Sequence, residues 1–235
     1  MEPALGSADV LRQLRAGGGG DPLAEAVSLT DLGLAQQMTG DYGPAAAGYA
    51  RALELFRLAG SEYDQADVLC ELGVLQRRTG NYPAAAASQR QALDLFRRLG
   101  DQLGQAWALD ELGLVQQLTG DDPAARASLR QALRLHRALG SRLAEAVALN
   151  SLGELSSRTS AAEEARSLHS QALVIAREIG APAEEARALA GIGASLLPGR
   201  PDEAAVHLRQ ALAISHRIGS PAARLIQDQL DRCGR

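Results

Sequence analysis

The sequence predicts an all-α fold: a right-handed α-solenoid of about five helix-turn-helix repeats, closed by a C-terminal capping helix. Three observations predict it. The chain repeats itself every forty residues, apolar residues recur at helical spacing, and most expected helices end on a glycine followed by a helix-starting residue. The composition agrees, because alanine and leucine dominate an apolar content of 46% while aromatic residues make up only 3%, which favours closely packed helices over a sheet.

The period is clearest in a Leu-Gly or Ile-Gly pair that each repeat contains. Its members are Leu32-Gly33, Leu72-Gly73, Leu112-Gly113, Leu152-Gly153 and Ile192-Gly193. A second series of glycines keeps the same spacing until its last step, which is one residue short and places a deletion near residues 197–201. A fixed period in this range is typical of stacked supersecondary units.

Each repeat is expected to contain two helices. In the second repeat Ala66, Leu69, Leu72 and Gly73 fall on one face of a helix, and the following helix shows the same apolar spacing. Glycines that can end a helix in the left-handed conformation stand at most of the boundaries. They are Gly40, Gly80 and Gly120 after first helices, and Gly60, Gly100, Gly140, Gly180 and Gly219 after second helices.

Residues that favour the start of a helix come directly after these glycines. They are Asp41, Ser61, Asn81, Asp101, Asp121, Ser141 and Ser220. Where Ser160 replaces the expected glycine, Ser160 and Glu163 are spaced as a capping box.

The helix pairs are therefore expected within residues 21–219. Their approximate ranges are 22–59, 62–99, 102–139, 142–179 and 182–218. A short helix at Ser7–Arg15 and a glycine-rich joint at 17–20 make up the N-terminal segment 1–20. The segment 220–235 is expected to hold the capping helix, from Pro221 to about Arg232, and a tail.

The glycines of the Leu-Gly pairs lie inside helices, where each costs about 1 kcal/mol relative to alanine. Their recurrence predicts close backbone approach between paired helices, with Ala45, Ala85 and Ala125 as the small facing residues. This pattern resembles the tetratricopeptide repeat, which carries Leu-Gly on its first helix and a small alanine on its second. The resemblance covers residues 22–219 and departs from the family in its forty-residue period and in its leucines where tryptophan often stands.

Repeats of forty residues are similar to those of kinesin light chains. The runs QALVIAREIGAPAEEARALAGIG at 171–193 and HLRQALAISHRIGSPAAR at 207–224 resemble the C-terminal arrays of actinomycete antibiotic-regulatory transcription factors and of signal-transduction ATPases with numerous domains. That resemblance implies a sensing or autoinhibitory arm of a larger regulator. It also implies that partners lie along the concave face of the stack. If each first helix is numbered so that the glycine of its Leu-Gly pair is position eight, positions two, five, nine and twelve line this face.

The candidate partner-binding residues are the variable letters at and beside these positions, since repeated letters build the stack. Trp107, the only tryptophan, is either a binding hot spot or a side chain that fills a local gap. Arg77, Arg78 and Arg158 either clamp an anionic group or complement helix C-termini. The full set is Trp107, Asp67, Cys70, Val74, Arg77, Arg78, Asp110, Leu114, Gln117, Asn150, Glu154 and Arg158.

Composition excludes several function classes. The net charge of -4, with arginine as the only basic residue besides histidine, argues against direct nucleic-acid binding. No signal sequence and no apolar run of about 18 residues is visible, so neither secretion nor a membrane is expected. Two cysteines, Cys70 and Cys233, do not form a disulfide framework and suit a cytoplasmic protein.

No motif for catalysis, a cofactor or a metal stands out, so the chain is expected not to be an enzyme. A phosphate-binding loop needs a lysine that the chain lacks, and no nucleophile elbow occurs. The histidines fall on expected second helices without metal-ligand spacing and are interpreted as ordinary surface or seam residues. They are His136, His169, His207 and His216.

The sequence thus favours a module that binds a peptide or helix of a partner protein, or another domain of the same regulator. An acidic patch at Asp31, Glu71, Asp110 and Glu111 favours a basic or amide-rich partner. Two alternatives remain: a scaffold that dimerises through its stack ends, and a receptor for a peptide pheromone or small ligand.

Overall fold

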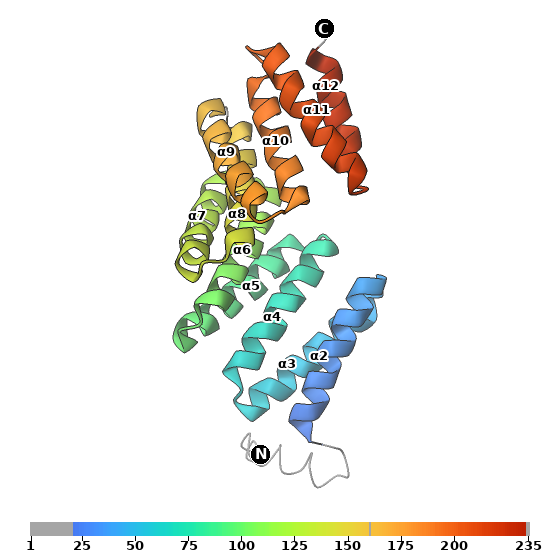
Figure 1. The fold of residues 1–235 in the computed structure, drawn as a ribbon. Coiled ribbons are helices and arrows are strands. Elements are labelled where there is room, and N and C mark those ends of the chain that lie inside the picture. Colours follow the sequence, from blue (N-terminus) through green and yellow to red (C-terminus); the bar gives the residue numbers. More distant parts are fainter. Residues whose placement is uncertain (1–20, 160, 234–235) are drawn as a thin grey trace, which may run out of the picture. The chain divides into compact units, whose positions relative to one another are not determined.

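The computed structural model describes residues 21–159 and 161–233, which form eleven helices and no strand (Figure 1). The all-α fold of consecutively packed helix pairs is therefore confirmed. The expected helix at Ser7–Arg15, the joint at 17–20, Ser160 of the expected capping box and residues 234–235 of the tail lie outside the described residues. The chain divides into two compact units between Asp121 and Asp122.

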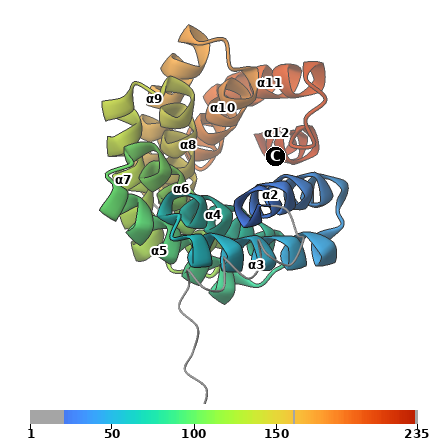
Figure 2. The same ribbon diagram turned by 90° about the horizontal axis from the view of Figure 1, so that it is seen from below.

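Unit 1 contains the first five helices, and each packs against the next. The first helices of the pairs, α2, α4 and α6, also contact one another in sequence and form what we call the first-helix face of the unit. Figure 2 shows α2 and α4 together on one side and α3 and α5 on the other. The bounds are α2 Pro22–Thr39, α3 Tyr42–Ala59, α4 Glu62–Arg78, α5 Tyr82–Leu99 and α6 Gln102–Leu118.

Unit 2 follows the same order and ends in α12, which packs against α11 as a further first helix would. Ile226 of α12 is buried against Leu189, Leu208 and Ala211 and thus covers the core of the last pair. The bounds are α7 Asp122–Leu139, α8 Arg142–Arg158, α9 Ala162–Glu178, α10 Pro182–Leu196, α11 Pro201–Arg217 and α12 Ala223–Cys233.

The boundary glycines take the expected conformation, since all eight have positive φ between 64° and 89°. The capping side chains follow the prediction less closely. Asn81 and Asp101 accept hydrogen bonds from the backbone of the helix they start, whereas Asp41 and Ser61 do not. Their side chains have other partners: Asp41 accepts a hydrogen bond from the Thr39 hydroxyl, and Ser61 donates one to Asp64.

The prediction that alanines face the interior glycines was wrong. A methyl group added to Gly33 would lie 2.7 Å from the ring of Tyr49, and one added to Gly73 would lie 2.5 Å from the amide of Gln89. In unit 2 the facing side chains are likewise large. They are His169 opposite Gly153 and Leu208 opposite Gly193. Each of these four glycines therefore makes room for a long side chain of the second helix, while Ala45, Ala85 and Ala125 are buried as well.

This packing predicts opposite effects for two Gly→Ala changes in the first pair. Gly33→Ala should lower the free energy of unfolding by about 1–3 kcal/mol, because the new methyl group overlaps a rigid, fully buried ring. Gly43→Ala, with open space around it, should leave stability unchanged or raise it by up to about 1 kcal/mol. Urea unfolding followed by circular dichroism measures both; equal stability of the two variants would contradict the packing argument.

Candidate functional site

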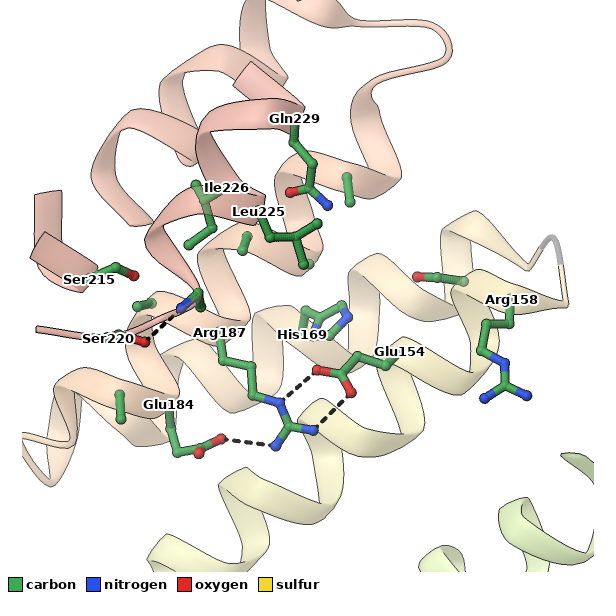
Figure 3. A pocket seen from close by; sticks show the side chains of 17 residues that line it. Glu154, Arg158, His169, Glu184, Arg187, Ser215, Ser220, Leu225, Ile226 and Gln229 are labelled. Atoms are coloured by element: carbon green, nitrogen blue, oxygen red, sulfur yellow. Dashed lines mark hydrogen bonds and ion pairs between the residues drawn. The ribbon is translucent and has the colours of Figure 1, made fainter. Parts of the chain in front are cut away.

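A pocket of about 540 Å³ opens in unit 2 among α8, α10 and α12 (Figure 3). Its wall is mostly apolar, because α10 contributes small side chains that leave space and α12 contributes Leu225 and Ile226. Leu225 is 63% exposed, and Ile226 is the one buried residue of α12. The alanines that line the pocket are Ala183, Ala186, Ala190 and Ala194 of α10, and Ala222, which directly precedes α12.

The charged side chains on one side of the pocket are paired with one another. Arg187 binds both oxygens of Glu154, with Nε to Oε1 at 2.6 Å and Nη2 to Oε2 at 2.9 Å. Its Nη2 also donates to the hydroxyl of Ser151 at 3.0 Å, and its Nη1 lies 3.5 Å from Glu184 Oε2. With its donors engaged in this way, Arg187 positions the two carboxylates and has little capacity left for an anionic ligand.

Below this group lies a buried chain of hydrogen bonds. Asn150 Nδ2 donates to Glu184 Oε2 at 2.8 Å, and Asn150 Oδ1 accepts from His169 Nδ1 at 2.9 Å. Burial lowers the pKa of His169 from 6.5 to about 4, so the ring is neutral near pH 7 and carries its proton on Nδ1. Its Nε2 is then a bare acceptor without a partner, beside the pocket that the ring helps to line.

Two glycines give the imidazole this position. A methyl group added to Gly153 or Gly191 would lie 2.6 Å or 2.3 Å from Nε2. The ring therefore crosses between α8 and α10 only because both helices lack a side chain there. The result is a mostly apolar pocket with uncharged acceptors in its wall, suited to an apolar group that carries an N–H or O–H donor. These acceptors are the buried Nε2 of His169 and the side-chain oxygens of Ser157, Ser215, Ser220 and Gln229.

The structure separates the sequence-predicted residues. Glu154 and Arg158 line the pocket in unit 2, and Arg158 also pairs with Asp122 at 2.6 Å. Asn150 is completely buried, so the expectation that it contacts a partner was wrong. The other nine lie in unit 1. They are Asp67, Cys70, Val74, Arg77, Arg78, Trp107, Asp110, Leu114 and Gln117.

Within unit 1 these residues differ in accessibility. Trp107 is 41% exposed, which leaves its indole available, and Arg78 is also exposed. Arg77 pairs through Nε with Glu111 Oε2 at 2.9 Å, so it does not serve as a free clamp. Cys70 is fully buried, and that burial, with nearby carboxylates, holds the pKa of its thiol far above the usual range; a direct contact with a partner is therefore wrong for this residue as well.

Sequence reasoning missed most of the pocket. Arg187 occupies position two of its first helix, as Trp107 does. Other repeats have valine or aspartate at this position, and that variation could have marked Arg187 as a candidate. His169 was interpreted as ordinary, although it stands opposite a helix glycine where the last repeat has Leu208. Leu225 carried no signal, because its exposure depends on how α12 packs.

Two further classes of site were searched for in the part of the chain that the structure describes. No group of three or more His, Cys, Asp or Glu side chains there could hold a metal ion. Nor is any helix of this part long and apolar enough to cross a membrane.

Comparison with known proteins identifies the repeats. Residues 64–138 match the tetratricopeptide repeat family, and we conclude that this part of the chain consists of tetratricopeptide repeats. The resemblance to the tetratricopeptide repeat noted in the sequence is thereby confirmed. Comparison with the curated protein sequences found no match.

Solved structures share the fold at low sequence identity. BtubC from P. vanneervenii is 20% identical with a TM-score of 0.68, over 96% of this chain and 88% of that one. The signal transduction ATPase with a tetratricopeptide repeat sensor from Pyrococcus horikoshii is 16% identical with a TM-score of 0.81, over 96% of this chain but only 35% of that one. A Rap protein complexed with Competence and Sporulation Factor is 16% identical with a TM-score of 0.73, over 96% and 67%.

The low pKa of His169 predicts a pH-dependent stability. Above pH 6.5 the imidazole is neutral in both the folded and the unfolded chain, and its full contribution is present. Between pH 6.5 and about pH 4 the unfolded chain takes up a proton that the folded protein excludes, so the free energy of unfolding falls by about 3 kcal/mol.

Urea unfolding near pH 7 and near pH 4 tests this on the natural protein and on His169→Leu, which carries the residue found at Leu208. Between the two pH values, the free energy of unfolding of the variant should fall by about 3 kcal/mol less than that of the natural protein, because the acidic residues titrate alike in both proteins. Equal losses would show that His169 is not held neutral.

Proposed function

We propose that this chain is a protein-binding module whose unit 2 holds an apolar side chain of a partner peptide in the pocket between α8, α10 and α12. The observation that carries the proposal is the combination of apolar walls with the unpartnered Nε2 of His169. A peptide offers both matching features, since every apolar residue except proline carries a backbone N–H. Tetratricopeptide repeats as a class present extended surfaces for such partners.

We further infer a regulatory role, as a sensing arm that responds to a peptide or to another domain of the same regulator. Two proteins of the same fold support this: one is described as an ATPase with a tetratricopeptide repeat sensor, and the other is a Rap protein bound to Competence and Sporulation Factor. A non-enzymatic role, a cytoplasmic location and the absence of nucleic-acid partners stay predictions from the sequence, as does the link to actinomycete regulators.

Phage display of random twelve-residue peptides on the folded protein tests the pocket. Selected peptides should share an apolar residue and lose about 10–100-fold in affinity to Ala194→Phe, because the new ring fills the space that the peptide side chain would bury. Val174→Phe is the matched control, since it introduces the same aromatic side chain at an exposed position of α9 outside the pocket. Failure to select peptides, or equal loss in both variants, would refute the proposal.

Self-association is a second candidate function, favoured by an exposed apolar surface on α2. Val27, Leu32, Leu34 and Met38 are all more than 40% exposed. Covering them with a second copy would remove apolar surface from water. Sedimentation velocity at rising concentration should then show dimers that Leu32→Gln with Met38→Gln abolishes; a monomer at all concentrations would exclude this role.

A further inference from the structure

Glu71 of α4 is a half-buried carboxylate to which the described part of the chain gives no ion pair and no hydrogen bond. Burial raises its pKa, and the charges of Asp67 and Glu111 raise it further, while Arg78 acts in the opposite direction. A carboxylate in this position is poorly solvated, and nearby negative charges destabilise its ionised form. A neighbouring cation would stabilise that form. Among the described residues, the exposed Arg78 is the one cation whose charge lowers this pKa.

The next repeat contains the same arrangement with its cation in place. Forty residues after Glu71, Glu111 pairs with Arg77, and both side chains are about one-fifth exposed. The residue forty positions before Arg77 is Gln37 of α2, which the repeat therefore places opposite Glu71 as Arg77 lies opposite Glu111. An amide cannot neutralise the carboxylate, so the first of these two equivalent pairs lacks its positive charge.

Two other polar atoms in the same region also lack partners. Gln37 is only 4% exposed, and its Oε1 is buried without a hydrogen bond. Tyr49 is completely buried beside Gly33, and its hydroxyl has no partner either. Burial raises the pKa of Tyr49 to about 12, and the charge of Glu71 raises it further.

Buried polar atoms without partners are rare in native proteins, and each costs about 1–3 kcal/mol. Here an amide oxygen of α2, a phenolic oxygen of α3 and an unpaired carboxylate of α4 belong to three helices that pack against one another, with α2 and α4 side by side (Figure 2). We call Gln37, Tyr49 and Glu71 the acceptor cluster. What these three groups share is that a cation with several N–H donors would satisfy all of them.

We propose that the acceptor cluster of unit 1 binds a basic side chain of a partner peptide, an arginine above all. The guanidinium group carries the positive charge that Glu71 lacks and enough donors for Gln37 Oε1 and Tyr49 Oη as well. Its place would correspond to that of Arg77 in the next repeat. This inference goes beyond the pocket of unit 2, because it concerns other residues and the opposite ligand chemistry.

A titration with an acetylated, amidated pentapeptide of arginine between glycines tests the proposal, with the citrulline peptide as the uncharged isostere. The peptides lack apolar side chains, so the pocket of unit 2 does not contribute. Amide resonances of α2 and α4 in the ¹⁵N-labelled protein should shift saturably with arginine, and at least about tenfold more weakly with citrulline. No saturation below about 10 mM, or equal binding of both peptides, would overturn the proposal.

Three variants identify the residues responsible. Glu71→Gln should weaken binding about tenfold or more, whereas Glu54→Gln, which removes the same charge from an exposed site on α3, should bind as the natural protein does. Gln37→Arg should restore the internal ion pair, abolish peptide binding and raise the melting temperature. Ala194→Phe should bind normally, which separates this site from the pocket.

Unchanged affinity in Gln37→Arg or Glu71→Gln would overturn the proposal, and so would an equal loss in Glu54→Gln. Circular dichroism of each variant establishes that it is folded before it is titrated. Glutamine is close in size to glutamate, so Glu71→Gln should fold and keeps the experiment decisive even where Gln37→Arg does not fold.

Discussion

The packing of a long second-helix side chain against a first-helix glycine is the constraint on which both units depend. A methyl group at Gly33, Gly73 or Gly153 would overlap the side chain opposite, so the helices keep these glycines despite a cost of about 1 kcal/mol each. The alanines of the second helices are buried in the seam beside them. A tight seam thus coexists with one long side chain per pair that crosses between helices.

That crossing connects packing to function. The crossing residue is polar in three pairs, Tyr49, Gln89 and His169, and each has a buried polar atom without a partner. Gln89 is partly satisfied, since its amide donates to the carbonyl of Cys70 at 3.0 Å. In the last pair Leu208 occupies the place and fills it without any polar atom. Polar crossing residues therefore bring hydrogen-bonding groups toward the first-helix face, whereas leucine only packs.

The sequence was sufficient for the helices because their signals are local. A glycine that must take positive φ ends a helix whatever its neighbours are, and Gly40, Gly60 and Gly100 behaved as expected. The site was harder to predict because burial depends on several helices at once. Cys70 and Asn150 occupy position five, which the fold analogy assigns to a groove, yet both are covered completely. The pocket needs Leu225 from α12, whose packing the repeat pattern does not contain.

Departures from the repeat carry more information about function than the repeated letters do. Arg77 and Glu111 form an ion pair within unit 1, and the exchange of that arginine for Gln37 leaves Glu71 unpaired. In unit 2 a change from the repeat adds a cation instead of removing one, since Arg187 supplies a positive charge that Glu154 and Glu184 share. The two sites therefore favour different ligands. The pocket of unit 2, whose carboxylates are paired with Arg187, favours apolar groups, whereas the unpaired carboxylate of Glu71 in unit 1 favours a cation.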